Sequence, residues 1–205
     1  AMHEFVEQLA KDERLRSLSF QNVKVVPFLG TPGAIQSDSW NTTTYSNTLA
    51  TKVGNLLHCA SYNLSAPMYV EGTKEKELIE SIDEIAKVLH MAETADIALI
   101  GIGSMQDDSS IIKAEIRTKE EYKELVRKGA VGEIVGRIYD KNGQTVDEDL
   151  KRKMVGISLD KIAKIPVRVG MSYGKDKIEA IKGAIAGGLV NVLVTDVPTA
   201  ELLLK

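Results

Sequence analysis

Short apolar runs alternate along the chain with stretches of helical periodicity, and this alternation most limits what the chain can fold into. The apolar runs that predict strands are 23–28, 57–61, 96–102, 131–139, 166–170 and 191–195. The segments that predict helices are 2–15, 45–56, 74–89, 119–127, 175–186 and a short last helix after Asp196. Several β–α units in series imply a mostly parallel sheet with helices on both faces. We therefore predict an α/β fold.

Local patterns sharpen several of these elements. The run 96–102 lacks alternation, which predicts a strand buried on both faces. Thr118 and Glu121 form a capping box, and Asp196 precedes a helix that has proline in its first turn. Asn142-Gly143 predicts a tight hairpin, the one antiparallel feature. One helix is expected over 74–89, capped by Thr73, with an apolar face made by Leu78, Ile82, Ile85 and Leu89.

Composition narrows the class of protein and its partners. The chain has 205 residues, a formal net charge of −3 and 5% aromatic residues. That length suggests one domain over 1–205, and the charge and aromatic content argue against a nucleic-acid platform. The lone Cys59 lies in an apolar segment, which predicts a buried structural thiol in a reducing, cytoplasmic setting. No apolar run reaches the length of a membrane span, so no membrane partner is expected.

Two glycine-bearing stretches directly follow predicted strands. Ligands of parallel sheets bind at the carboxyl ends of the strands. In Gly30-Thr-Pro-Gly33, exposed backbone N–H groups and the Thr31 hydroxyl suit a phosphate, and an ordinary turn is the alternative. In Gly101-Ile-Gly-Ser104, Gly101, Gly103 and Ser104 offer the same groups, and close packing between strand and loop is the alternative. The spacing is not that of a dinucleotide-binding loop.

Two further stretches add charge at strand ends. Glu133 could accept hydrogen bonds from sugar hydroxyls, and an exposed strand glutamate is the alternative. Gly174 and Lys177 precede the helix at 175–186, where backbone N–H groups and an ammonium group suit a phosphate. Solvated lysines in a first helical turn are the alternative.

Other constellations are absent from the sequence. The three histidines lack the spacing of a metal site, and no nucleophile elbow is present, so neither a metal nor a cofactor is expected. The polar stretch from Pro32 to Asn41 is expected to contact a ligand that binds at the strand ends.

Taken together, the chain resembles the effector-binding domain of the SorC family of bacterial transcriptional regulators. The resemblance is carried, in the family's order, by Val25-Val-Pro-Phe-Leu-Gly30, Asp96-Ile-Ala-Leu-Ile-Gly-Ile-Gly-Ser104, Gly129-Ala-Val-Gly-Glu-Ile134, Gly174 with Lys177 before Ala180-Ile181, and Leu193-Val-Thr-Asp196 with Thr199-Ala200. It implies a Rossmann-like domain related to sugar-phosphate isomerases and deaminases, with a phosphorylated sugar as effector.

The resemblance also implies residue roles and partners. Lys177 matches the lysine that binds phosphate, Glu133 an acidic position that touches sugar hydroxyls, and the remaining matches face the ligand from loops: Gly30, Thr31, Gly101, Gly103, Ser104 and Gly174. Family regulators are dimers or tetramers, so a homo-oligomer is expected. DNA contacts are expected only through a helix-turn-helix outside this chain. The family's first strand and its glycine-rich turn are expected ahead of Met2.

Three functions follow as hypotheses. The first is a non-enzymatic sensor domain whose occupancy by a phosphorylated sugar changes the DNA affinity of a full-length regulator. The second is a sugar-phosphate isomerase or deaminase on the same fold, with Glu133 as the candidate base. The third is an interaction module without a small-molecule site.

Overall fold

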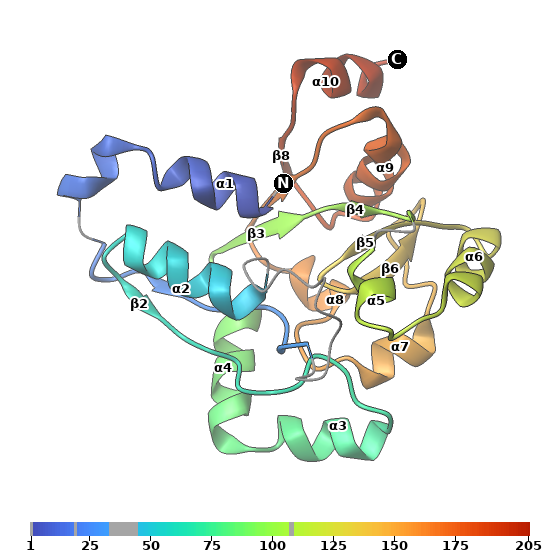
Figure 1. Cartoon of the computed structure of the whole chain (residues 1–205), viewed down its shortest axis with the longest axis horizontal. Coiled ribbons are helices and arrows are strands. Elements are labelled where there is room, and N and C mark those ends of the chain that lie inside the picture. The colour runs from blue at the N-terminus through green and yellow to red at the C-terminus, as the bar shows by residue number, and fades with distance from the viewer. Residues whose placement is uncertain (1, 19, 33–44, 107–108) are drawn as a thin grey trace.

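The computed structural model describes residues 2–18, 20–32, 45–106 and 109–205, and it confirms a mixed α/β architecture (Figure 1). The α-helices are α1 (Met2–Leu9), α2 (Ser46–Leu56), α3 (Thr73–Glu80), α4 (Asp83–Glu93), α5 (Ser110–Lys113), α6 (Lys119–Arg127), α7 (Glu148–Lys153), α8 (Leu159–Ile162), α9 (Ile178–Ala186) and α10 (Val197–Leu203). The 3-10 helices are η1 (Glu13–Ser17) and η3 (Lys175–Lys177). The strands are β1 (Lys24–Val25), β2 (Ala60–Ser61), β3 (Ile97–Gly101), β4 (Gly103–Ser104), β5 (Ala130–Ile134), β6 (Arg137–Asp140), β7 (Val167–Met171) and β8 (Val192–Val194).

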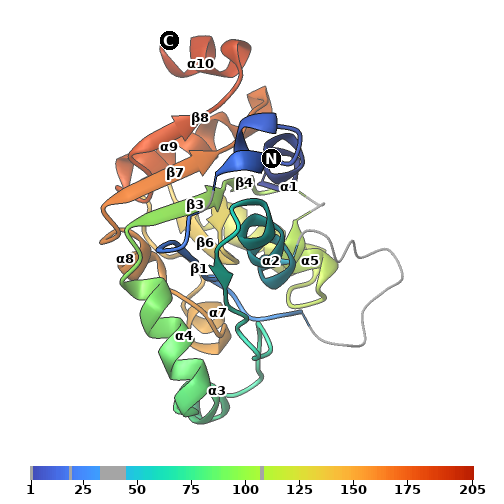
Figure 2. The same ribbon diagram turned by 90° about the vertical axis from the view of Figure 1, so that its left-hand side faces the viewer.

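The strands of the described residues form three small sheets. Strands β1 and β2 pair in parallel, and a second parallel sheet has the order β3-β7-β8. The third sheet, β4-β5-β6, is antiparallel. Helices α1 and α2 lie on one side of β3 and helix α9 on the other, as expected (Figure 1). Figure 2 shows β3, β7 and β8 stacked edge to edge.

The antiparallel sheet separates two hydrophobic cores. Ile134 and Tyr139 face a core that also contains Ile100 of β3 and Ile181 of α9. Ile138 faces a second core, which is built from α5, α6 and α7. The β5–β6 hairpin therefore buries both of its faces, and the buried apolar area of both cores stabilises it.

Three predicted elements differ from the structure. The expected helix over 74–89 is two helices, because the backbone of Ile82 is extended and the Ser81 hydroxyl donates to the carbonyl of Leu78. Thr73 is the first helical residue and Gly72 the N-cap. Of the expected apolar face, Leu78 is 71% and Ile82 51% exposed, so that face does not continue through the break.

The expected strand over 131–139 is a hairpin. It reverses at Val135 and Gly136, which both have positive φ, as a tight two-residue hairpin turn requires. The predicted Asn142-Gly143 turn is also present: the Asp140 side chain accepts hydrogen bonds from the backbone N–H groups of Asn142 and Gln144. The sheet therefore has more antiparallel pairing than the sequence indicated.

The expected strand over 96–102 is not buried throughout. Burial alternates along β3, with Ala98 and Ile100 in the core and Ile97 57% exposed. Among the described strands β3 pairs only with β7, so one of its edges has no described neighbour. At the start of the chain, α1 ends at Leu9 rather than continuing to residue 15.

Arg137 ties the hairpin to the chain that follows α7. Its guanidinium is buried and donates to the carbonyls of Met154 and Gly156 at 3.3 and 3.0 Å. Burial lowers the pKa of Arg137 to about 10, partly offset by the charges of Glu80 and Asp160. Arg137 thus remains charged near neutral pH.

The capping box of α6 gives the first testable prediction. The Thr118 hydroxyl accepts from the backbone N–H of Glu121, and the Glu121 carboxylate accepts from the backbone N–H of Thr118. Thr118→Ala should lower the free energy of unfolding by about 1 kcal/mol. Thr118→Ser keeps the hydroxyl and should stay near the parent value in urea denaturation. Equal loss in both variants would contradict the capping role.

Candidate functional site

Four of the predicted site residues lie on or against the paired strands β4 and β5. We call Gly103, Ser104, Glu133 and Lys177 the strand-end cluster. Gly103 lies opposite Glu133 and Ser104 opposite Gly132 in the β4–β5 ladder. The Lys177 ammonium nitrogen donates to the Ser104 hydroxyl at 2.8 Å, across 73 residues of sequence. The structure therefore joins residues from three separate predicted strand ends.

Glu133 is a buried carboxylate with hydroxyl partners. Glu133 is only 9% exposed to solvent. Oε2 accepts hydrogen bonds from Ser109 Oγ at 2.7 Å and from the Tyr122 hydroxyl at 3.2 Å. These bonds compensate for the loss of water around the carboxylate. The alternative of an exposed strand glutamate is wrong.

Sequence reasoning missed Ser109 and Tyr122. Tyr122 follows the N-cap Thr118 by four residues and lies one helical turn before Leu125, so its burial on α6 was readable from periodicity. Its direction toward Glu133 was not readable, because it depends on how α6 packs on β5. Ser109 follows a polar stretch that carries no distinguishing pattern.

Tyr139 lies beside the cluster in the core. Its hydroxyl donates to the carbonyl of Ala180 in α9 at 2.9 Å. Burial, together with the nearby charge of Glu133, raises the pKa of Tyr139 far above its usual value. Tyr139 therefore stays neutral and acts as a donor that joins the hairpin to α9.

Lys177 remains within reach of a ligand. It ends η3, one residue before α9 begins, and its side chain is 25% exposed. Asp176 is its nearest carboxylate partner, at 3.9 Å. An ammonium group carries three donors, so its bond to Ser104 leaves capacity for an anion.

The loop before Lys177 is fixed by hydrogen bonds to its neighbours. Gly174 has a φ of +103°, a backbone conformation that favours glycine. Its N–H donates to Thr199 Oγ1 at 2.8 Å rather than pointing to an open ligand site. The Tyr173 hydroxyl donates to Glu4 of α1 at 3.0 Å, so this side chain extends toward α1.

Gly101 closes β3 next to the cluster. It pairs with Met171 of β7, and a Cβ placed on it would lie 3.7 Å from Cβ of Met2. The start of α1 thus lies over this strand end. Ordinary contact at that distance leaves room for a small side chain at Gly101.

The backbone hydrogen bonds of Gly30 and Thr31 join them to segments outside the strand-end cluster. Thr31 exchanges backbone hydrogen bonds with Ala66 and Met68, and Gly30 donates to the carbonyl of Val155. A Cβ on Gly30 would lie 2.5 Å from the carbonyl oxygen of Pro67, so close backbone packing explains this glycine. Their ligand roles stay predictions. The expected contact segment from Pro32 to Asn41 lies, apart from Pro32, outside the described residues.

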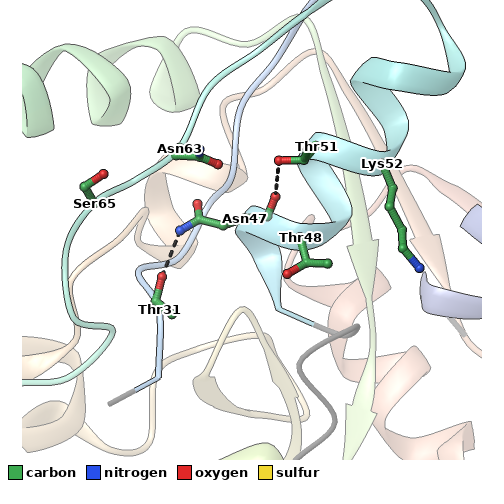
Figure 3. A pocket seen from close by; sticks show the side chains of 7 residues that line it. All are labelled: Thr31, Asn47, Thr48, Thr51, Lys52, Asn63 and Ser65. Carbon is green, nitrogen blue, oxygen red and sulfur yellow. Dashed lines mark hydrogen bonds between the residues drawn. The ribbon is translucent and has the colours of Figure 1, made fainter. Parts of the chain in front are cut away.

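Thr31 lines a polar cavity of 470 Å³ (Figure 3). The lining residues are Thr31, Asn47, Thr48, Thr51, Lys52, Asn63 and Ser65. The Asn47 amide donates to Thr31 Oγ1 at 2.8 Å, as the dashed line in Figure 3 shows. This cavity is a second concentration of polar groups, built by α2 and the chain after β2.

Several other features bear on chemistry. Within the described ranges, no group of three histidine, cysteine or acidic side chains is placed to hold a metal ion. Cys59 is half-buried rather than fully buried, and burial raises the pKa of its thiol. No helix of the described residues has the length and apolar character to cross a membrane.

Comparison with known proteins decides the family. A family model for a sugar-binding domain, Sugar-bind, matches residues 6–205. The chain belongs to this sugar-binding family. The transcriptional regulator LsrR of Escherichia coli O9:H4 is 35% identical over 159 residues, which cover 76% of this chain and 50% of that protein. The chain thus spans about half the length of the curated relatives it matches.

Solved structures agree with this assignment. The full-length sorbitol operon regulator SorC of Klebsiella pneumoniae superposes with a TM-score of 0.85 at 29% identity, over 98% of this chain and 63% of that one. A transcriptional regulator of Streptococcus pneumoniae TIGR4 gives 0.80 at 26% identity, over 96% of this chain and 73% of that one. The sugar-binding domain is therefore of the SorC type, and the predicted Rossmann-like α/β fold is confirmed.

Gly103 offers a test of how the strand-end cluster is packed. A Cβ at this position would lie 2.6 Å from Cγ of Glu133, too close without movement of one of them. Gly103→Ala should lower the free energy of unfolding by about 1–3 kcal/mol, as overpacking does.

Gly101→Ala is the matched control, because its nearest contact is an ordinary 3.7 Å. Thermal unfolding followed by circular dichroism measures both variants. Equal midpoints for the two would show that Glu133 does not press on Gly103.

Proposed function

We propose that this domain senses a phosphorylated sugar for a bacterial transcriptional regulator in the cytoplasm, and that binding changes the regulator's affinity for DNA. The observation that carries the proposal is the strand-end cluster. There a partly exposed ammonium group donates to a hydroxyl at the end of β4, and the paired strand β5 carries a buried carboxylate. This combination suits a ligand that has both an anionic group and hydroxyl groups.

Each member of the cluster has a proposed role. Lys177 binds the phosphate, helped by Ser104 and by the backbone N–H groups at the start of η3 and α9. Glu133 orients the sugar by accepting hydrogen bonds from its hydroxyls, which replace or supplement those of Ser109 and Tyr122. Gly101, Gly103 and Gly174 keep the loops narrow, and Gly30 and Thr31 contribute from the neighbouring turn.

The non-enzymatic role is supported by the kind of relative that the chain matches. LsrR and SorC are transcriptional regulators. Glu133 is the candidate base for an isomerase, yet its carboxylate is already hydrogen-bonded to two hydroxyl groups. Turnover of pentose or hexose phosphates by the purified protein would contradict the sensor proposal in favour of the enzyme.

Lys177 provides the decisive variant. A sugar phosphate at about 100 times its Kd should stabilise the native domain by about 2.7 kcal/mol, a rise in melting temperature of about 5–10 °C. In Lys177→Met this rise should vanish while the melting temperature without ligand changes little. A thermal-shift panel of sugar phosphates measures both.

Lys175→Met is the matched control, because Lys175 is exposed and lies in the same short helix. It should keep the full ligand-induced rise. A panel in which no sugar phosphate stabilises the parent protein, or in which both variants lose the response equally, would count against the proposed site.

A second copy of the chain is the proposed partner in solution. The outer strand β8 and helix α10 expose large apolar side chains, and Figure 1 shows both elements projecting from one end of the molecule. These side chains are Val192, Val194, Val197, Leu202 and Leu204. An apolar patch on a sheet edge favours association of identical chains.

Val194→Lys should shift the protein toward a smaller species, because a lysine at the proposed interface must lose water or repel its symmetry mate. Light scattering coupled to size-exclusion chromatography reads the mass. Val126→Lys, at a similarly exposed valine on α6, should leave the mass unchanged. A parent protein that is monomeric throughout would contradict the oligomer.

A further inference from the structure

The hydroxyl of Tyr122 reaches the strand-end cluster from inside the domain. Tyr122 is 2% exposed and lies in the second hydrophobic core, which also contains Leu125, Ile138 and Met154. Its hydroxyl donates to Glu133 Oε2 at 3.2 Å. A phenylalanine would fill the same apolar space, so packing alone does not account for the hydroxyl. The hydrogen bond to the Glu133 carboxylate accounts for it.

A second hydroxyl meets the same carboxylate oxygen. Ser109 is buried, and its Oγ donates to Glu133 Oε2 at 2.7 Å. The same Oγ accepts the backbone N–H of Ile111 at 3.1 Å, which holds the Ser109 side chain in place. The terminal torsion of a glutamate side chain is soft, with broad preferences. Two donors on one oxygen therefore set the plane of the Glu133 carboxylate before a ligand binds.

Strand β4 confines Glu133 from another direction. A Cβ on Gly103 would lie 2.6 Å from Cγ of Glu133 and 3.1 Å from its Oε1. The backbone of β4 thus lies directly against this side chain. The carboxylate cannot turn without breaking the hydrogen bonds from Tyr122 and Ser109 or pressing on β4.

Helix α6, which carries Tyr122, is itself anchored. Arg117 directly precedes the N-cap of α6, and its guanidinium makes two hydrogen bonds to the Asp147 carboxylate of α7, at 2.9 and 3.1 Å. Both side chains of this pair are largely buried. Such bidentate pairs are strong and geometrically specific. Because α6 also packs on β5, the Tyr122 hydroxyl is held at a fixed position relative to Glu133.

The phosphate half of the proposed site is positioned by other elements. Lys177 belongs to η3, and its ammonium donates to Ser104 of β4. The hydrogen bonds from Tyr122 and Ser109 to the cluster end instead at Glu133 of β5. The group proposed to bind phosphate and the group proposed to bind hydroxyls are therefore supported separately, and each can be altered without removing the other.

From these contacts we infer that Tyr122 is a positioning residue, which sets how strongly the site prefers a sugar phosphate to bare phosphate. The inference rests on the proposed function, because it takes Lys177 as the partner of the phosphate and Glu133 as the partner of the sugar hydroxyls. Tyr122 acts through Glu133. With the carboxylate plane fixed, a sugar hydroxyl forms its hydrogen bond without the entropy cost of ordering the Glu133 side chain. Inorganic phosphate has no sugar hydroxyl, so its affinity does not depend on Tyr122.

The ratio of two affinities tests this inference. Inorganic phosphate, D-ribose 5-phosphate, D-glucose 6-phosphate and D-fructose 6-phosphate are titrated separately into the purified protein at one pH and salt concentration. Kd values come from backbone amide shifts in NMR spectra. The sugar phosphate that binds the parent most tightly is then titrated into the variants. Tyr122→Phe should weaken its Kd about threefold to tenfold and leave the Kd of inorganic phosphate unchanged.

Two further variants complete the series. Tyr69→Phe is the matched control, because the Tyr69 hydroxyl also donates to a glutamate carboxylate, that of Glu71 at 3.3 Å, and lies outside the strand-end cluster. It should change neither Kd. Ser109→Ala removes the other donor to Glu133 and should shift the ratio in the same direction as Tyr122→Phe, so the inference is tested even if one of these two variants does not fold.

The outcomes separate this inference from the proposed function. Lys177→Met should weaken the binding of both ligands, whereas Tyr122→Phe should weaken only that of the sugar phosphate. If Tyr122→Phe and Ser109→Ala keep the parent's ratio, or weaken both ligands equally, the positioning role is overturned and the proposed function stands. If the parent prefers none of the three sugar phosphates to inorganic phosphate, the proposed function fails and the positioning role fails with it.

Discussion

The contact between the β5–β6 hairpin and helix α9 is the constraint on which the rest of the domain depends. Gly132 has no side chain, and a Cβ there would lie 2.5 Å from the Tyr139 hydroxyl and 2.7 Å from Cβ of Ala180. The hairpin can therefore press directly on α9, where Tyr139 donates to the carbonyl of Ala180. This close approach sets the depth of β5, and the depth of β5 sets where the Glu133 carboxylate lies relative to Ser104 and Lys177.

Much of the fold could be predicted because its determinants are local. The capping box at Thr118, the Asp196 cap with proline in the first turn and the turn at Asn142-Gly143 each depend on residues within four positions of one another. Their geometry follows from hydrogen bonds that the short segment makes with itself. Parallel strands such as β7 were recognisable for a related reason, since a short apolar run between turn-forming residues indicates a strand.

Other features depend on contacts between distant segments and could not be predicted. The 74–89 pattern fits one helix, and only packing shows that Leu78 and Ile82 have nothing to cover. The hairpin turn at Val135 places a β-branched residue at positive φ, which local preference disfavours. At the strand ends, the glycine pattern indicated Gly103 and Ser104 of β4, while the hydroxyl partners of Glu133 came from α6 and from Ser109, outside any strand end. Gly30 allows close packing against the carbonyl of Pro67. In the sequence, a glycine required for packing looks the same as a glycine in a ligand-binding loop.

The hydrogen bond from Gly174 to Thr199 has a mechanical consequence. It fastens the loop that carries Lys177 to α10, and the Asp196 cap holds Thr199 in the first turn of that helix. One hydrogen bond joins the loop directly to the helix, so a displacement of the backbone around Lys177 would be transmitted to α10. A small rearrangement at the strand ends would be read out as a change in the outer surface at the far end of the chain.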